Sequence, residues 1–255
     1  MKSERKDFIL DKIRREKKIK AQEIVQEFNV TMETVRRDLE ELEEMGLLRR
    51  VYGGAIEGRI YEPEPSYDTR TVTRLSEKQA MAKEAVKLIE DEETVFIDGG
   101  TTCLEVAKEL AKSDKRIVAI TNALTVAEVL LTSPNIKVII LGGVLNQGET
   151  TVTNILNHNQ IDMFNFQKTI MGAASISPSQ GVTDYNLDVT ILKKEIIESS
   201  DKVIFVADHS KFNKRVRYTV ASYNEIDVVI TDAETSEDDI RILESDGIEV
   251  IVAGQ

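Results

Sequence analysis

Residues 21–54, AQEIVQEFNVTMETVRRDLEELEEMGLLRRVYGG, decide the fold of the first part of the chain. Apolar residues recur there at helical spacing in two runs, Ile24, Val25 and Phe28, then Val35, Leu39 and Leu42. Two such stripes predict two helices that pack face to face. Between them, Asn29 tolerates a left-handed turn and Thr31 is a suitable N-cap for a helix that starts near Met32. The pattern therefore predicts a helix-turn-helix.

The start of the second helix is expected to expose a polar face. When its apolar stripe faces the core, the residues between the apolar positions point outward, where they can enter the major groove of DNA. An arginine there can pair with guanine or hold a phosphate, and a threonine can touch a base edge. Past Gly46, residues 47–54 predict two short strands, a wing with cationic sides and a glycine pair. The candidate DNA-binding residues are Glu33, Thr34, Arg36, Arg37, Arg49, Arg50, Tyr52, Gly53 and Gly54.

A third helix and the charge distribution support a complete winged head. The stretch from Ser3 to Arg15 places Phe8, Ile9 and Ile13 at core spacing. Residues 1–60 have 14 Lys+Arg and 13 Asp+Glu, whereas the remainder has 19 and 32, within an overall net charge of −12. Because screening limits repulsion to about 8 to 10 Å, the local charge of the head dominates at contact. The alternative is a helical module with a solvated charged face that binds another protein.

The segment 33–55, ETVRRDLEELEEMGLLRRVYGGA, resembles the signature of the DeoR family of bacterial repressors. The family joins a winged helix-turn-helix to an effector domain similar to sugar-phosphate isomerases. Its segment usually carries a histidine where this chain has Tyr52. A tyrosine can also stack or donate to a phosphate, so the resemblance still implies DNA binding by this segment.

Length and composition predict two domains and argue against a secreted, membrane-spanning, disulfide-linked or metal-binding protein. The 255 residues fit a small head and one α/β domain. No run has signal-peptide or membrane-spanning character, so a cytoplasmic protein is expected. The single cysteine, Cys103, excludes an internal disulfide and is expected to be buried in a helix. With two histidines, His158 and His209, and no second thiol, we expect no metal site and no cofactor.

Seven short apolar runs follow a segment that contains Pro63 and Pro65. The expected boundaries are a DNA-binding head over 1–57, a linker over 58–75 and an effector domain over 76–255. The seven expected strands are 94–98, 116–122, 137–143, 168–174, 202–208, 227–232 and 248–254. The helices expected between them are 76–90, 102–112, 124–132, 187–200 and 236–246. Continuous apolar strands are typical of sheets buried on both faces, so the fold class is α/β with a mainly parallel, doubly wound sheet.

Small and polar residues follow several of these strands, where doubly wound sheets bind ligands. Asp98, Gly99, Gly100, Thr101 and Thr102 open a helix, and glycine N–H groups at a helix start can cradle a phosphate. Asn122, Gly142, Gly143 and Gly172 follow three further strands, and Lys211 follows a fourth and can add a cation. The loop matches neither a Rossmann fingerprint nor a P-loop. Taken singly, such residues are more often turns and helix caps than a binding site.

The order DGGTT, TNA, LGG, MGAA, ADHSKF resembles the DeoR effector domain, and through it ribose-5-phosphate isomerase and glucosamine-6-phosphate deaminase. The resemblance implies that Gly100, Thr101 and Thr102 hold a phosphate with Lys211, while Asp98 and Asn122 contact sugar hydroxyls or brace the loops. The isomerases have an acidic cluster after the equivalent of Gly172, whereas this chain has Ala173, Ala174 and Ser175. Without that proton-transferring carboxylate, we expect binding without catalysis and no catalytic residues.

Two departures from the family affect the choice of ligand. The family usually has a glycine at Ser175, and residues 151–166 lack a glycine common in that region. Asp184 and Asp188 remain candidate carboxylates for the alternative function, an active sugar-phosphate isomerase or deaminase with a DNA-binding appendage.

The sequence thus predicts a transcriptional repressor of a sugar or carbohydrate catabolic operon, released from operator DNA by a phosphorylated sugar. Since one head offers a small interface, a homodimer or homotetramer is expected, with half-sites spaced by about 34 Å or a multiple of it.

Overall fold

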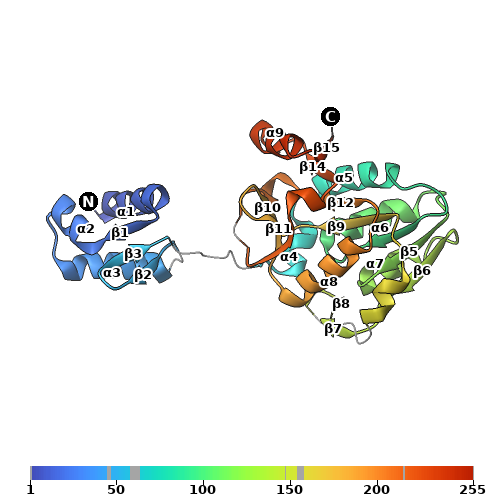
Figure 1. The fold of residues 1–255 in the computed structure, drawn as a ribbon, viewed down its shortest axis with the longest axis horizontal. Coiled ribbons are helices and arrows are strands. Elements are labelled where there is room, and N and C mark those ends of the chain that lie inside the picture. Colours follow the sequence, from blue (N-terminus) through green and yellow to red (C-terminus); the bar gives the residue numbers. More distant parts are fainter. Residues whose placement is uncertain are drawn as a thin grey trace. The chain divides into compact units, whose positions relative to one another are not determined.

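The chain divides into two compact units, Met1–Glu62 (the head) and Pro63–Gln255 (the α/β domain). The computed structural model (Figure 1) describes residues 2–44, 47–57, 64–146, 148–153, 158–214 and 216–254. Gly46 and the first six residues of the expected linker, 58–63, lie outside these ranges. Within them, no helix combines the length and the apolar run needed to span a bilayer.

The head has three helices and a small antiparallel sheet. The helices are α1 (Lys2–Glu16), α2 (Ala21–Phe28) and α3 (Met32–Glu44), and the strands are β1 (Lys18–Lys20), β2 (Arg49–Val51) and β3 (Gly54–Ile56) in the order β1-β3-β2. The expected apolar stripes pack together, because Ile9, Ile13, Ile24, Val35, Leu39 and Leu42 are all buried in one cluster. The three predicted helices and the two strands of the wing are confirmed. Strand β1 was not predicted.

A buried ion pair also fastens the head. The guanidinium of Arg5 on α1 donates to the carboxylate of Asp38 on α3, and both side chains are buried. Next to it, Lys6 Nζ lies 2.6 Å from Glu41 Oε2, again joining α1 to α3. The outward face of α3 is therefore held at a fixed angle to the rest of the head.

The α/β domain is built on seven parallel strands, which are the seven predicted from the sequence. They are β4 (Thr94–Ile97), β5 (Ile117–Thr121), β6 (Ile136–Ile140), β9 (Lys168–Gly172), β12 (Val203–Val206), β14 (Val228–Asp232) and β15 (Glu249–Ala253). Their order is β15-β14-β12-β9-β4-β5-β6, and every neighbouring pair is parallel. The expected α/β fold with a mainly parallel, doubly wound sheet is confirmed.

Helices cover both faces of this sheet. Helices α5 (Leu75–Lys87), α6 (Thr101–Ala111) and α7 (Leu124–Leu130) bury their apolar sides in one cluster, and α8 (Leu187–Glu198) and α9 (Glu237–Ser245) bury theirs in the other. Cys103 lies fully buried on α6, as predicted, and burial raises the pKa of its thiol. A thiol kept protonated in this way is a poor nucleophile.

The strand order reverses between β4 and β9. From β4 the chain proceeds outward through β5 to the edge strand β6, and it then returns to β9 and proceeds the other way to the edge strand β15. Crossovers therefore leave β4 and β9 in opposite directions, which opens a crevice beyond their carboxyl ends. This switch point is where the fold places a ligand site.

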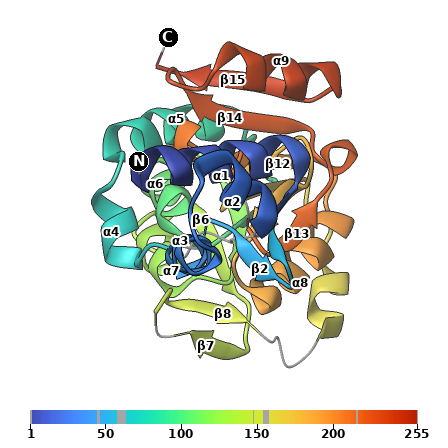
Figure 2. The same cartoon turned by 90° about the vertical axis from the view of Figure 1, so that its left-hand side faces the viewer.

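Several smaller elements were not predicted. They are the hairpin β7 (Val144–Asn146) and β8 (Thr151–Thr153), the antiparallel sheet of β10 (Ser175–Ser177), β11 (Gly181–Asp184) and β13 (Tyr218–Ala221), helix α4 (Tyr67–Val72), and the 3₁₀ turns His158–Met163, His209–Lys211 and Tyr223–Glu225. Helix α4 lies within the segment expected to be a linker. In the α/β domain the hairpin β7–β8 lies at the end away from α9 and β15 (Figure 2).

Candidate functional site

The turn before α3 has the geometry predicted for it. Asn29 adopts the left-handed conformation, with φ 46° and ψ 48°, and ends α2. The Thr31 Oγ1 atom accepts the N–H of Thr34 at 3.2 Å and so caps α3. The same oxygen lies 2.9 Å from Thr34 Oγ1, so the Thr34 hydroxyl already has a local partner. This residue is the least exposed of the four candidates on α3.

The two arginines of α3 project from the head with only loose partners. The side chains of Arg36 and Arg37 are 71% and 77% exposed, and each lies at 3.9 to 4.0 Å from a Glu33 oxygen. Exposed pairs at such distances contribute little to stability. Both guanidinium groups therefore keep their hydrogen-bonding capacity for a partner.

Five of the nine DNA-binding candidates line one groove between α3 and the wing, and Glu33, Thr34, Arg37 and Arg49 are not among its lining residues. This groove is lined by Met32, Arg36, Leu39 and Glu43 of α3, by Arg50, Val51, Tyr52, Gly53 and Gly54 of the wing, and by Lys20, Ala21 and Gln22. Tyr52 is fully exposed and Gly53 has φ +82°. A Cβ on Gly54 would lie 2.1 Å from the backbone oxygen of Ile19, so only glycine allows β1 to pair with β3 there.

The two wing arginines differ in their contacts. Arg49 is exposed. Arg50 instead turns back onto α3, where its Nε atom lies 2.7 Å from Glu43 and another guanidinium nitrogen lies 3.4 Å from Glu40. Its guanidinium braces the wing, so Arg50 has less charge available for DNA than Arg49, Arg36 or Arg37.

In the α/β domain, the loop after β4 forms the floor of a cavity at the switch point. Asp98, Gly99 and Gly100 lead into α6, and Gly100 has φ +96°. A Cβ on Gly99 would lie 2.3 Å from the Thr151 methyl carbon, so glycine lets β8 lie directly on this loop. The first N–H groups of a helix have no partners within it and carry positive potential. The loop is therefore suited to bind an anion.

Among the predicted effector residues, Asp98, Gly99, Gly100, Thr101, Thr102, Asn122, Gly172 and Lys211 all line this one cavity of about 110 Å³. Gly142 and Gly143 are exposed and are not among its lining residues. The reason is positional. They follow β6, an edge strand two positions from β4, whereas the cavity lies beyond β4 and β9.

A buried lysine that sequence reasoning missed organises the cavity. The ammonium of Lys193 on α8 lies 3.0 Å from Asp98 and 2.9 Å from Asp184, and it donates to the Gly172 carbonyl at 2.8 Å. Burial alone would lower the pKa of Lys193, but the two carboxylates raise it. Burial raises the pKa of Asp98, against the opposing charge of Lys193. The ammonium thus ties the ends of β4, β9 and β11 together.

A second cation enters from the segment that precedes α5. Arg70 on α4 donates to both carboxylate oxygens of Glu149, which stands between β7 and β8, and it lies 3.4 Å from Glu64. All three line the cavity. Burial raises the pKa of Glu64, and the charge of Glu149 adds to the effect. Two of the cavity's cations, Arg70 and Lys193, are therefore held by carboxylates of the protein itself.

Two polar atoms at the cavity have no hydrogen-bond partner among the described residues. They are Asn122 Oδ1 and Thr151 Oγ1, and both are buried. The Asn122 Nδ2 group donates to the Val152 carbonyl at 3.3 Å, which sets the orientation of the amide. Buried polar atoms usually have partners. A ligand with hydroxyl donors would supply them.

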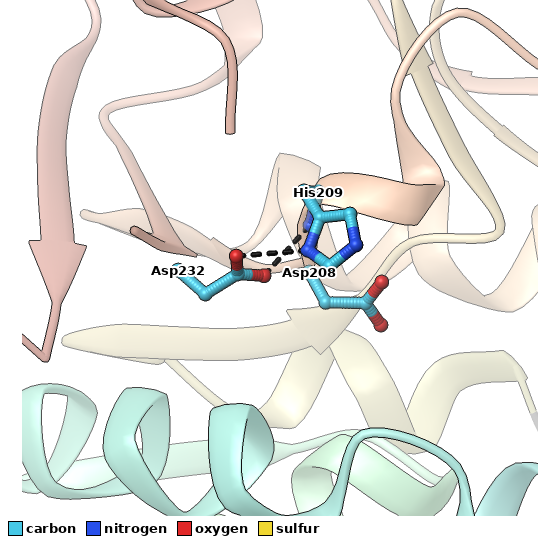
Figure 3. Close-up of side chains that lie close together, drawn as sticks. All are labelled: Asp208, His209 and Asp232. Carbon is cyan, nitrogen blue, oxygen red and sulfur yellow. Dashed lines mark hydrogen bonds and ion pairs between the residues drawn. The ribbon is translucent and has the colours of Figure 1, made fainter. Parts of the chain in front are cut away.

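Lys211 and its neighbours form the remaining wall, beyond β12. Burial lowers the pKa of Lys211, opposed by the charge of Asp208. Asp208, His209 and Asp232 lie close enough to offer three ligand atoms to a metal ion (Figure 3). Each carboxylate already has donors, since Asp232 accepts the His209 N–H at 2.8 Å and Asp208 accepts the Ser210 N–H at 3.0 Å.

Arg74 adds a positive charge at this cluster. Its Nε atom donates to His209 Nε2 at 3.2 Å and lies 3.7 Å from Asp208, and the other ring nitrogen of His209 lies 2.9 Å from Asp232. A metal ion would have to displace this guanidinium. The contacts fit a brace between the start of α5 and the loop after β12 better than a metal centre.

Comparisons with known proteins agree with this architecture. The DeoR-like helix-turn-helix domain matches residues 5–57 and the DeoR C-terminal sensor domain matches residues 73–233. The chain is 30% identical to the HTH-type transcriptional regulator GolR of Listeria innocua over 98% of each chain. It is 32% identical to the glycerol-3-phosphate regulon repressor of Escherichia coli over 91% of each. Among solved structures, it is similar to ribose 5-phosphate isomerase A of Methanocaldococcus jannaschii, with 16% identity, 55% of each chain covered and a TM-score of 0.42.

The architecture and these matches define a transcriptional regulator with a helix-turn-helix and a sensor domain. The chain belongs to the DeoR family. The residues that sequence reasoning missed are Glu64, Arg70, Asn146, Glu149, Thr151, Tyr185, Asn186, Val189 and Lys193, all of which line the cavity. None of them directly follows a strand of the large sheet, so the rule that located the others could not find them.

Proposed function

We propose that this chain represses a sugar catabolic operon by binding operator DNA through α3 and the wing, and that a phosphorylated sugar in the cavity of the α/β domain releases it. The head supplies the duplex contacts. Arg36 lines the groove between α3 and the wing, and Arg37 and Arg49 are exposed on the same two elements. A duplex carries a phosphate charge for about every 1.7 Å of its axis. The arginines of α3 would read base edges, and the wing would hold the backbone.

The observation that carries the effector proposal is the convergence of three features at one cavity. The N-terminus of α6 and Lys211 attract an anion, and the unpartnered oxygens of Asn122 and Thr151 accept hydroxyl donors. A phosphorylated sugar has both a phosphate and hydroxyls. Because the relatives include a glycerol-3-phosphate regulon repressor, a phosphate ester is the ligand class that we favour.

The pairing of Arg70 suggests how the ligand would act on the head. In the structure the guanidinium of Arg70 is hydrogen-bonded to the Glu149 carboxylate, so an incoming phosphate would compete with this carboxylate for the same guanidinium. Release of Glu149 would move α4 relative to the hairpin β7–β8. Since α4 (Tyr67–Val72) lies within the segment 58–75, that segment is the proposed transmission element. For the ligand to release the DNA, it must bind more tightly to the conformation or assembly in which the heads do not fit the operator.

A dimer or tetramer is part of this proposal. Specific protein–DNA complexes bury more surface than one small head offers, and two heads bind two half-sites on one face of the duplex. Two copies would also double the number of phosphate contacts. Their spacing would be one helical turn of about 34 Å or a multiple of it.

Catalysis is the second candidate, and the presence of Asp184 and Lys193 at the cavity favours it. Their contacts argue against a catalytic role. Asp184 Oδ1 accepts the N–H of Tyr185 at 2.7 Å, and its other oxygen pairs with Lys193. The raised pKa of Lys193 keeps it protonated, so it cannot act as a base. We propose that the site binds without turnover. Turnover of a pentose or hexosamine phosphate that Asp184→Asn abolishes would overturn this.

The test is a titration of operator affinity with a panel of sugar phosphates and the matching unphosphorylated sugars. We expect one phosphorylated member to weaken operator binding and its unphosphorylated form to have no effect. Lys211→Met should raise the ligand concentration needed by about tenfold or more, because a charged hydrogen bond contributes about 1.5 to 3 kcal/mol. Lys202→Met, on a partly exposed lysine outside the cavity, is the control. If no phosphorylated sugar changes operator affinity, the effector proposal is wrong.

A further inference from the structure

The two edges of the seven-stranded sheet differ sharply in charge. Residues 234–249, which include α9 and the start of the edge strand β15, contain seven acidic residues and one arginine. Residues 117–146, which include α7 and the opposite edge strand β6, contain two charged residues in 30, Glu128 and Lys137. Charged residues make up 31% of the whole chain. The edge at β6 is therefore depleted of charge.

The β6 edge also exposes apolar side chains. Five large hydrophobic residues between 124 and 145 are exposed, namely Leu124, Leu131, Ile140, Val144 and Leu145. Ile140 on β6 is 42% exposed and Val144 on β7 is 52% exposed. The N–H of Leu124 donates to the carbonyl of Thr150 at 2.9 Å, and Thr150 directly precedes β8, so the start of α7 lies beside the hairpin. Helix α7, strand β6 and the hairpin thus form one continuous margin.

Strand β6 pairs with β5 alone among the described strands, so its outer N–H and C=O groups face away from the sheet. Proteins usually protect such an edge with charges, prolines or a bulge. Here β15 has Glu249 and the acidic α9 beside it, whereas β6 has Lys137 alone. An edge left open and apolar is suited to pair with another strand.

We propose that this margin, formed by α7, β6 and β7, is the surface through which the α/β domains of two copies associate. Two copies each have a net charge of −12 and repel each other over most of their surfaces. The neutral margin is where that repulsion is smallest. A twofold axis that sets β6 antiparallel to its copy satisfies both rows of backbone groups and closes the assembly at two subunits.

This inference rests on the proposed function, which requires two heads and therefore at least two copies of the chain. The observations behind it are separate. The charge contrast, the open edge and the exposed side chains all lie in the α/β domain. The DNA contacts and the effector cavity use other residues. The surface can therefore be tested without an operator or an effector.

The test uses the full chain in sedimentation equilibrium over a range of concentrations. We expect the natural protein to be a dimer or larger, and Ile140→Lys to weaken self-association at least tenfold, because it places a charge in the paired edge. Glu249→Lys, the same lysine on the opposite edge strand, should leave association within about twofold of the natural value. Val144→Lys on β7 serves as a second variant, and circular dichroism checks that each remains folded.

Hydrogen exchange gives an independent measurement without any substitution. Amides of residues 136–145 should exchange more slowly as the concentration of the natural protein rises, and amides of residues 249–253 should not change. A natural protein that is monomeric at high concentration would overturn the inference, as would folded Ile140→Lys and Val144→Lys proteins that associate normally. A dimer that loses association in these variants but binds no operator would instead overturn the proposed function and leave this surface in place.

Discussion

The arginines on α3 of the head are exposed and loosely paired, whereas Lys193 at the cavity of the α/β domain is buried and has close partners. Arg36 and Arg37 lie 3.9 to 4.0 Å from one shared glutamate, and Lys193 lies within 3.0 Å of two carboxylates. Cations of the first kind remain available to an external anion. Cations of the second kind hold the protein together, so residue type alone does not indicate a binding role.

The α/β domain repeats this contrast in a pair of buried lysines. Lys193 has two carboxylate partners, which raise its pKa. Lys78 on α5 is equally buried but donates to the Arg70 carbonyl, and burial lowers its pKa to about 8. The carboxylate partners of Lys193 therefore account for the opposite directions in which the two pKa values shift.

Removing Lys193 should have the largest effect. Lys193→Met leaves Asp98 and Asp184 buried without a counter-charge, so the free energy of unfolding of the α/β domain should fall by about 3 to 5 kcal/mol. Urea unfolding followed by circular dichroism measures this. Lys202→Met removes a partly exposed lysine that lies 3.5 Å from Glu249 and should cost about 1 kcal/mol or less. Equal losses in the two variants would contradict the role given to Lys193.

The exposed pair should affect DNA binding and not stability. Replacing Arg36 and Arg37 together by alanine should weaken operator binding by about 10- to 100-fold and flatten its salt dependence, because base and phosphate contacts are both lost. Fluorescence anisotropy with a labelled operator measures both. Arg15→Ala, on an exposed arginine of α1 that pairs with Asp11 at 2.9 Å, is the matched control. A module that binds only proteins would show no duplex affinity to lose.

The smallest effect is expected from Lys78 and depends on pH. In the unfolded chain a lysine has a pKa of about 10.4, above the folded value of about 8. Between these values the unfolded state binds the extra proton, so this group makes stability rise with pH, by about 1 kcal/mol from pH 8 to 9. Lys78→Met should abolish that increment, while Lys83→Met, on the same helix, should retain it. Unfolding free energies at both pH values test this, and parallel profiles of all three proteins would refute it.

The sequence was sufficient for the large sheet because its strands are buried on both faces. A run such as VIFV at 203–206 is apolar throughout and is wholly buried. The short strands were not predicted because runs of three residues give only a weak hydrophobic pattern. Strand β1 is Lys-Ile-Lys, with one buried residue, and it forms only because Gly54 allows close approach. Likewise, β7 and β8 have three residues each and form a two-stranded sheet with each other.

Of the predicted effector residues, those that directly follow a strand near the switch point, such as Asp98 and Gly172, line the cavity. Gly142 and Gly143 do not line it, because strand order, which decides whether a strand end lies near the cavity, is not visible in the chain. Sequence reasoning also missed the pair of Arg70 and Glu149, which are 79 residues apart. No local pattern connects residues at such a separation.

The position of Glu64 and Arg70 matters for anyone who wishes to transplant this sensor onto a different DNA-binding module. The match to the DeoR C-terminal sensor domain starts at residue 73, yet both residues line the cavity from upstream of that point. A chimaera joined at residue 73 would lack two residues of the cavity wall, and Glu149 would lose the guanidinium with which it pairs. The splice belongs ahead of Glu64, so that the transplanted piece brings its whole ligand-binding enclosure with it.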